Sequence, residues 1–505
     1  MSNIFNQSRG SKPKKNAFDL SHENKLSLNM GDLVPFYQQD VIPGDSFKLN
    51  SEIFMRLAPM VSPVMHKINV FAHYYFVPYR ILWTNWNDFI TGGENGLANP
   101  SFPKIAVESI TYDHFQKGSL ADYLGIPIPP AVITNALSVS AMPFRAYQMI
   151  YNEYYRDQNL QSKVSFPLGD IASNNFTEFL ALTTMRMRAW EKDYFTSCLP
   201  EAQKGGEVLL PIDSTVDYLD QSKVYNNDGS PANGALASAS GDLSAGATAS
   251  RVENIHGIEN TVTVNDLRRV TRLQMWLERN MRGGSRINEM LYNHFGVKSK
   301  DSRLQRPEFL GGGRQNVIIS EVLATAESDA GPLGEMGGHG ISAGGMNGFT
   351  KTFDEHGIIL GIMSVLPRTS YMNQGIDRSL QKFDKFDYFW PEFAQLGEQE
   401  VMINELYHNY TESSGYNPPF GYQSRYAEYK YKQSQVHGDF KDNLDFWHLS
   451  RKFANEPSLN STFITSDPRH DIFAVTDPSV HKLYAQVYHN VRAIRPIPVF
   501  NNPSL

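Results

Sequence analysis

The sequence predicts a mainly β protein, built as a sandwich or barrel of many short strands with long, partly helical insertions. Residues 24–80 contain strand-like runs, and from Val70 to Val77 both alternating faces are apolar or aromatic, as in a strand that is buried on both sides. From Ile358 to the C-terminus, short strand-like runs alternate with turns rich in Pro and Gly. Helical patterns appear in the middle of the chain.

Turn and strand signals place individual elements near both ends of the chain. Ile42 to Asp45 reads Ile-Pro-Gly-Asp, which predicts a turn, and Pro78 ends the strand that contains Val70. Three strands are expected toward the C-terminus: Ile358 to Leu366, Asp471 to Val475 and Leu483 to Val491.

Three helices are predicted between these regions: Phe144 to Asn159, Thr177 to Cys198 and Asn265 to Met281. The third has an apolar face made of Leu267, Val270, Leu273, Trp276 and Leu277. Its other face holds Arg268, Arg269, Arg272 and Arg279. These arginines can line a DNA-facing surface or form ion pairs between subunits. We favour ion pairs, because guanidinium groups suit bidentate interface contacts.

Two stretches have compositions that do not favour a core. Asn226 to Ser250 contains no aromatic residue and no Lys or Arg, so it cannot bury enough apolar surface to offset the entropy of ordering it. A long segment of this kind within a domain is either functional or disordered. Gly331 to Gly348 is also Gly-rich, and we expect it to behave similarly.

Composition and charge narrow the function classes. The chain has 505 residues, of which 41% are hydrophobic and 12% aromatic, which suits a large core or extensive interfaces. The net charge of −7 means that the chain as a whole is not a basic nucleic-acid binder, so any DNA contact must be local. The N-terminus lacks the apolar region of a signal peptide, and no apolar run is long enough to predict membrane insertion.

The clearest local basic cluster lies at the N-terminus. Residues 1–17 have no acidic residue and contain Arg9, Lys12, Lys14 and Lys15. This composition predicts a flexible basic arm that contacts phosphate without sequence preference, although an ordinary frayed terminus has the same look.

No motif predicts catalysis, and we expect no cofactor and no metal site. Asp467 to Asp471 groups acids with a base, but catalytic partners are seldom adjacent in sequence, so a turn is favoured. Gly338 to Ala343 matches a GxGxxA pattern without the preceding strand and following helix that a dinucleotide site needs. Cys198, the single cysteine, has no nucleophile motif around it, and the 14 histidines show no paired ligand spacing.

The most informative stretch is Pro418 to Phe440, which interleaves tyrosines with basic residues: Tyr422, Tyr426, Tyr429 and Tyr431 with Arg425, Lys430 and Lys432. It closely resembles a segment of the major capsid proteins of gokushoviruses, the small single-stranded-DNA phages of the microvirus group. Further segments are similar to that family in the same order: His66 to Gly93, Glu355 to Arg378, Asp384 to Val401 and Asn490 to Phe500.

The resemblance implies a fold. Members of this family are jelly rolls, so we expect an eight-stranded antiparallel sandwich of two four-stranded sheets with long inter-strand insertions. After a basic arm at residues 1–20, residues 21–505 form one capsid domain. Within it, residues 214–258 look like the insertion that projects at the three-fold axis of the shell. The candidate receptor residues there are Asn226, Asn227, Asp228, Leu236, Asp242 and Leu243.

The resemblance also implies a function without a catalytic step. Sixty copies would assemble into a T=1 icosahedral shell in the bacterial host cytoplasm and enclose a circular single-stranded DNA genome. The expected partners in the virion are minor capsid or DNA pilot proteins, and a host cell-surface receptor is contacted during attachment. The candidate subunit-interface residues are Tyr422, Arg425, Tyr426 and Tyr429.

Two other classes of protein also favour aromatic β-sandwiches. A carbohydrate-active enzyme would need paired carboxylates about 5 to 10 Å apart in an open cleft. A carbohydrate-binding, lectin-like module would work as a soluble oligomer. The size of the assembled particle separates both from a shell protein.

Overall fold

A computed structural model of the chain describes residues 13–206, 208, 223–226, 249–253, 264–284, 286–323, 325, 336–412 and 415–500. The chain divides into two compact units. The first comprises Met1–Ala202 and Gly284–Leu505, and the second comprises Gln203–Gly283.

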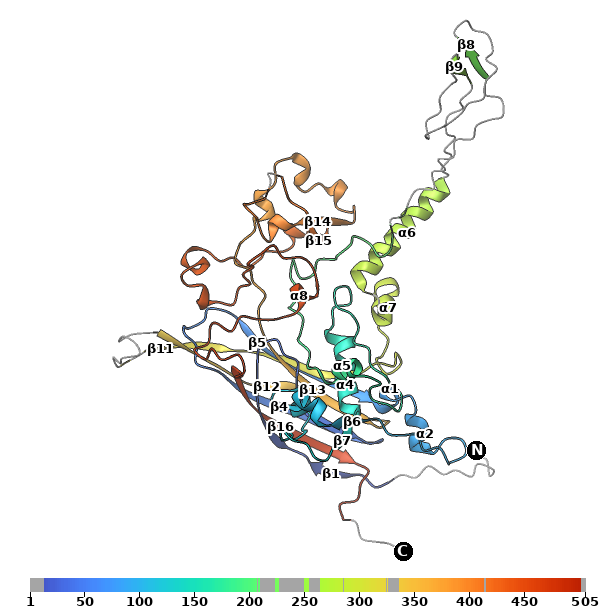
Figure 1. Cartoon of the computed structure of the whole chain (residues 1–505), viewed down its shortest axis with the longest axis vertical. Helices are drawn as coiled ribbons and strands as arrows, with labels where there is room; N and C mark the ends of the chain where they lie inside the picture. Colours follow the sequence, from blue (N-terminus) through green and yellow to red (C-terminus); the bar gives the residue numbers. More distant parts are fainter. Residues whose placement is uncertain are drawn as a thin grey trace. The chain divides into compact units, whose positions relative to one another are not determined.

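Two antiparallel sheets form the body of the first unit (Figure 1). The larger sheet has the order β1-β16-β4-β12-β11, with β2 also paired to β16. Its strands are β1 Asn16–Asp19, β2 His22–Leu28, β4 Ser46–Leu57, β11 Ile318–Leu323, β12 Met336–Thr352 and β16 Leu483–Arg495. The smaller sheet has the order β10-β5-β13-β3. Its strands are β3 Val34–Val41, β5 Ile68–Pro78, β10 Glu308–Asn316 and β13 Gly357–Pro367.

The mainly β, antiparallel prediction is confirmed, and the arrangement is consistent with a jelly roll. The described strands divide six and four between the sheets rather than four and four. The larger sheet has more than four strands because β1 and β2 both pair with β16, along successive parts of it, and because β11 pairs with β12 as an edge strand.

Shorter elements complete the two units, with β8, β9 and α6 in the second unit and the others in the first. Two-stranded pairs are formed by β6 Lys104–Val107 with β7 Leu137–Ser140, β8 Lys223–Asn226 with β9 Ala249–Glu253, and β14 Glu398–Met402 with β15 Pro419–Ser424. The helices of the described residues are α1 Tyr79–Leu82, α2 Trp86–Thr91, α3 Leu120–Tyr123, α4 Met142–Ile150, α5 Phe176–Thr183, α6 Val264–Gly283, α7 Ile287–Phe295 and α8 Ser461–Ile464.

The central strands of the smaller sheet, β5 and β13, are buried on both faces. Along β5, Val70, Ala72, Tyr74 and Phe76 belong to the cluster shared with the larger sheet, whereas Tyr75 and Val77 belong to a second cluster with α1, α3, α4 and α5. The prediction of a doubly buried strand from Val70 to Val77 is therefore confirmed. The larger sheet differs, because β16 alternates strictly between buried and exposed residues over most of its length.

A polar chain crosses the core between the two sheets. The Tyr74 hydroxyl donates to Ser51 Oγ at 2.6 Å, and Ser51 Oγ lies 2.7 Å from Nδ1 of the fully buried His489. Nε2 of His489 lies 3.2 Å from Phe36 O, which can only accept. Nε2 of His489 therefore carries the proton, and Nδ1 accepts a hydrogen bond from Ser51. With His489 neutral, all of these polar groups have hydrogen-bond partners.

Several predicted elements are wrong in ways that the structure explains. Of the helix expected from Thr177 to Cys198, only α5 forms, because the backbone beyond it pairs elsewhere: Arg188 N donates to Gly31 O at 2.8 Å and Trp190 N to Ile464 O at 2.9 Å. The strand expected from Asp471 to Val475 is a turn with one bridge from Phe473 to Met60. The helix expected from Phe144 to Asn159 is confirmed as α4 and a π-helical turn over Tyr151–Tyr155, but it ends before Asn159.

The Gly-rich stretch Gly331 to Gly348 was expected to lie outside the core, and for its described part this prediction is wrong. From Met336 onward it is the long strand β12, paired with both β4 and β11. A Cβ at Gly338 would overlap Ser62 O, and one at Gly348 would overlap Leu49 O. The glycines are therefore needed for close backbone approach within a sheet rather than for a loop. Residues 331–335 lie outside the described residues.

We predict that this core makes stability depend on pH. Burial lowers the pKa of His489 from 6.5 to about 4, so the unfolded chain binds a proton more readily than the folded chain between these values. The free energy of unfolding should be highest above pH 6.5 and should fall by about 3 kcal/mol as the pH drops to 4, at roughly 1.4 kcal/mol per pKa unit. The measurement is chemical denaturation of the unassembled protein at several pH values.

The matched comparison is between His489→Gln and His73→Gln. Burial also lowers the pKa of His73 to about 4, so each variant should remove part of the pH dependence. A His489→Gln protein with the same slope of stability against pH as the natural chain would contradict the assignment.

Candidate assembly and nucleic-acid surfaces

The tyrosine-rich segment begins as β15, which pairs with β14. The backbone of Tyr422 exchanges two hydrogen bonds with Leu199, at 2.8 and 2.9 Å, which fixes the segment to the chain that follows α5. Beneath it lies a third apolar cluster that includes Phe195, Cys198 and Phe420. Burial raises the pKa of the Cys198 thiol, and its sulfur donates to Tyr194 O at 3.2 Å. The thiol is thus a packed core group.

Tyr426 is the centre of this segment. It has a left-handed backbone, with φ of 60°, and its side chain is only 4% exposed. Its N–H donates to Gln399 Oε1 at 3.0 Å, and its hydroxyl accepts from Trp390 N at 3.2 Å. The Arg425 guanidinium lies 4.8 Å from the centre of the Tyr426 ring. Tyr426 therefore supports the loops from within its own chain, whereas Tyr429 is 54% exposed.

Charged side chains join the tyrosine segment to the neighbouring loop. Lys382 Nζ lies 3.5 Å from Glu428 Oε1 and 3.8 Å from the centre of the Tyr429 ring. Lys432 pairs with Asp377 at 2.7 Å. Burial opposes ionisation of Asp377, but hydrogen bonds from Lys432 and Ser379 outweigh it and lower the pKa of Asp377 to about 2.

The loop tied down in this way carries a large exposed apolar surface, which we call the 380–396 surface. Its exposed members are Leu380, Phe383, Phe386, Tyr388, Phe389, Trp390 and Leu396. Phe383 is 90% exposed. Soluble monomers seldom expose so many large apolar side chains together, so this surface is a candidate interface. Sequence reasoning marked Asp384 to Val401 as similar to the capsid family but did not predict an exposed surface there, although the dense run of aromatics after Lys382 is a usable signal.

The N-terminal cluster is partly described. Lys14 is exposed, and Lys15 Nζ donates to Gly44 O in the predicted turn after β3. Arg9 and Lys12 lie outside the described residues. Lys15 immediately precedes β1, so the basic arm leads directly into the edge of the larger sheet.

The expected protrusion belongs to the second unit. Asn226 ends β8 and pairs with Ala249 at the start of β9, so these strands bracket residues 227–248. The other candidate receptor residues lie outside the described residues: Asn227, Asp228, Leu236, Asp242 and Leu243. In α6, the predicted apolar face is not buried within the described unit, since Leu267, Leu273 and Trp276 are each about half exposed.

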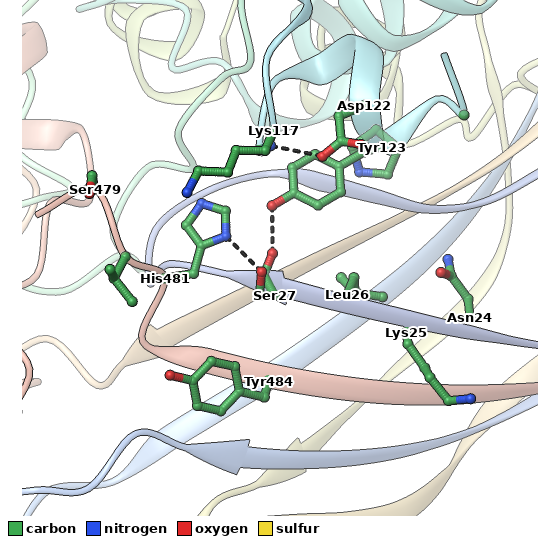
Figure 2. Close-up of a pocket in the computed structure, with 14 residues that line it drawn as sticks. Asn24, Lys25, Leu26, Ser27, Lys117, Asp122, Tyr123, Ser479, His481 and Tyr484 are labelled. Carbon is green, nitrogen blue, oxygen red and sulfur yellow. Dashed lines mark hydrogen bonds between the residues drawn. The ribbon is translucent and has the colours of Figure 1, made fainter. Parts of the chain in front are cut away.

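A polar pocket of about 540 Å³ lies at one end of the larger sheet, between β2, β16 and the loop at residues 117–125. Figure 2 shows Lys117 reaching over His481, with Tyr484 and Lys25 on the strands below. His481 Nδ1 lies 2.9 Å from Ser27 Oγ, and the Tyr123 hydroxyl donates to Ser27 O at 2.6 Å. Sequence reasoning missed this pocket, because its residues come from three distant segments.

Among the described residues, no group of three or more His, Cys, Asp or Glu side chains is placed to hold a metal ion. None of the helices in the same ranges is long and apolar enough to cross a membrane.

We predict opposite roles for the two neighbouring tyrosines. Tyr426→Ala should lower the free energy of unfolding by about 3 kcal/mol, because it empties a buried aromatic site. Tyr429→Ala should change the stability of the unassembled protein by less than about 1 kcal/mol, because its ring is largely exposed. Thermal or chemical unfolding of the two variants measures the difference. Equal destabilisation would refute this division of roles.

The chain is similar to known proteins over its whole length. A family model described as "Capsid protein (F protein)" matches residues 6–505. The capsid protein VP1 of Chlamydia phage 1 is 34% identical over 589 aligned positions, which cover 100% of this chain and 98% of that protein. The capsid protein VP1 of Bdellovibrio phage phiMH2K is 33% identical, covering 97% and 95%. The capsid protein VP1 of Spiroplasma virus 4 is 29% identical, covering 99% and 97%.

Proposed function

The chain belongs to the capsid protein (F protein) family, and from this membership we propose that sixty copies of it form a T=1 icosahedral shell around a circular single-stranded DNA genome. Its role in the phage virion is structural rather than enzymatic. Assembly in the bacterial host cytoplasm and contacts with minor capsid or DNA pilot proteins are part of the proposal.

The 380–396 surface supports shell formation most directly. It gathers exposed aromatic side chains on loops that are themselves held by Tyr426 and by the Lys382–Glu428 pair. Aromatic residues on a rigid support are typical of energetically dominant interface positions. We propose that neighbouring copies cover this surface, together with Tyr422, Arg425 and Tyr429, within an interface larger than roughly 2,000 Å².

We predict that polar substitutions on this surface block assembly without unfolding the chain. The double variant Phe383→Ser and Phe386→Ser should lower the yield of particles about tenfold or more. The reason is that each loss of about 1.4 kcal/mol of contact free energy weakens association between copies tenfold. Sedimentation of purified particles measures the yield, and unfolding of the free protein checks the fold. Leu97→Ser, at an exposed site in a different loop, is the control. Normal particle yield from the double variant would remove this surface from the interface.

For genome enclosure we propose that the basic arm contacts phosphate. Arg9, Lys12, Lys14 and Lys15 form a cluster without an acidic neighbour in residues 1–17. Each neutralised phosphate should contribute roughly 0.7 to the slope of log affinity against log salt for single strands.

For host attachment we propose the insertion within residues 214–258, projecting at the three-fold axis. The segment between β8 and β9 supplies little that a core requires, and loops on a rigid scaffold tolerate change and carry recognition. Three copies that meet at a symmetry axis can order one another, with Leu236 and Leu243 shielded among them.

We predict that replacing residues 227–248 with an Asn-Gly turn leaves assembly intact and lowers adsorption to host cells. The strands that flank the segment, β8 and β9, remain able to pair across a two-residue turn. Particle yield and adsorption are measured on the same preparation. Failure to assemble would make the segment structural, and normal adsorption would remove its recognition role.

A further inference from the structure

One wall of the pocket at the end of the larger sheet is formed by the exposed face of β16. Tyr484, on β16, is 44% exposed and lies at the mouth of the pocket. Antiparallel pairing places Arg56 of β4 on one side of Tyr484 and Ser27 of β2 on the other. One step further along the same face, Gln486 lies between Phe54 and Lys25. Aromatic and basic side chains therefore share this part of the face.

Charge and shape are both built into the site. Lys25 and Lys117 line the pocket, and Asp122, the carboxylate in the lining, is engaged by Gly118 N at 2.8 Å. Lys25 also lies 3.3 Å from Glu23, an exposed pair that holds it only weakly. A Cβ at Gly118 would overlap the His481 ring, so glycine lets this loop close over the pocket. The volume of about 540 Å³ falls within the usual range of small-molecule sites.

Farther along β16, the exposed tyrosine has acidic rather than basic neighbours. Tyr488 lies four residues beyond Tyr484 on the same face and is similarly exposed, at 41%. Its two cross-strand neighbours are carboxylates, Glu52 and Glu23. A polyanion is therefore favoured at Tyr484 and disfavoured at Tyr488, although the two rings are alike.

We propose that this pocket binds one nucleotide of single-stranded DNA, with the base stacked on Tyr484 and the flanking phosphates held by Lys25, Lys117 and Arg56. A stacking ring surrounded by cations is the combination with which proteins hold single strands without reading sequence. The inference rests on the proposed enclosure of single-stranded DNA and adds a defined site beside the basic arm.

The experiment uses the unassembled full-length protein and a fluorescently labelled dT oligonucleotide, with anisotropy measured over a series of salt concentrations. Tyr484→Ala should weaken binding about tenfold or more, and Tyr484→Phe should bind like the natural chain because stacking is kept. Lys25→Ala and Lys117→Ala should each reduce the salt slope by roughly 0.7.

The controls come from the same chain. Tyr488→Ala is matched in residue type, strand and exposure, and Lys163→Ala removes an exposed charge elsewhere, so both should bind normally. Equal losses from Tyr484→Ala and Tyr488→Ala would overturn the site, as would normal binding by Tyr484→Ala and Lys117→Ala. If Tyr484→Ala blocks assembly but not DNA binding, a second copy of the chain covers this face and the inference is wrong.

Failure of the site and failure of the proposed function give different results. If the pocket variants bind normally while alanines at Arg9, Lys12, Lys14 and Lys15 abolish binding, DNA enclosure stands and the pocket is excluded. If the natural chain does not bind the oligonucleotide and purified particles contain no DNA, genome enclosure itself fails.

Discussion

Burial of two facing sheet surfaces is the constraint on which the rest of this protein depends. Strands β4 and β16 pair from Leu483 opposite Leu57 to Ile494 opposite Ser46, and alternate residues of both point into the core. A one-residue slip would expose that whole apolar set, so the register is strongly specified. The hydrogen bonds that link Tyr74, Ser51 and His489 also constrain how the sheets pack, because they can form in only one arrangement of the two sheets.

The two sheets differ in what covers their outer faces. The far face of the smaller sheet packs on the insertion between β5 and β10, where the buried Arg145 donates to Leu82 O at 3.1 Å and to Gly169 O at 2.8 Å. The larger sheet leaves its outer face open along β16. The first unit thus has one covered and one uncovered sheet face, which is the asymmetry that a shell subunit requires if its two surfaces meet different environments.

Sequence reasoning succeeded where local pattern and tertiary role agree. Strand β5 and the strand from Ile358 were predictable because residues buried on both faces form continuous apolar runs. It failed at β12, where close backbone approach demanded glycines that normally signal a loop. It failed beyond Thr183, where an apolar periodicity was overridden by backbone pairing with distant segments. Local propensity cannot anticipate either effect, because both depend on neighbours far away in the sequence.

The candidate surfaces were also predictable to different degrees, according to how far each depends on residues that are distant in the sequence. The tyrosine segment was visible as a run of residues, but the sequence did not separate the buried Tyr426 from the exposed Tyr429, because that difference is set by contacts with Gln399 and Trp390. The pocket beside Tyr484 was invisible, since Lys25, Lys117 and His481 meet only after the sheet has formed. Long-range strand order, rather than any motif, brings them together.

The loops of the proposed 380–396 interface are held by hydrogen bonds within the chain itself. Asp387 accepts hydrogen bonds from Phe383 N at 2.9 Å and Asp384 N at 2.8 Å, and Trp390 Nε1 donates to Lys385 O at 2.8 Å. These bonds fix short turns, so the exposed rings are presented on backbone that is already ordered. Because ordering loops and side chains at an interface costs free energy, a surface fixed in advance retains more of its burial energy for association.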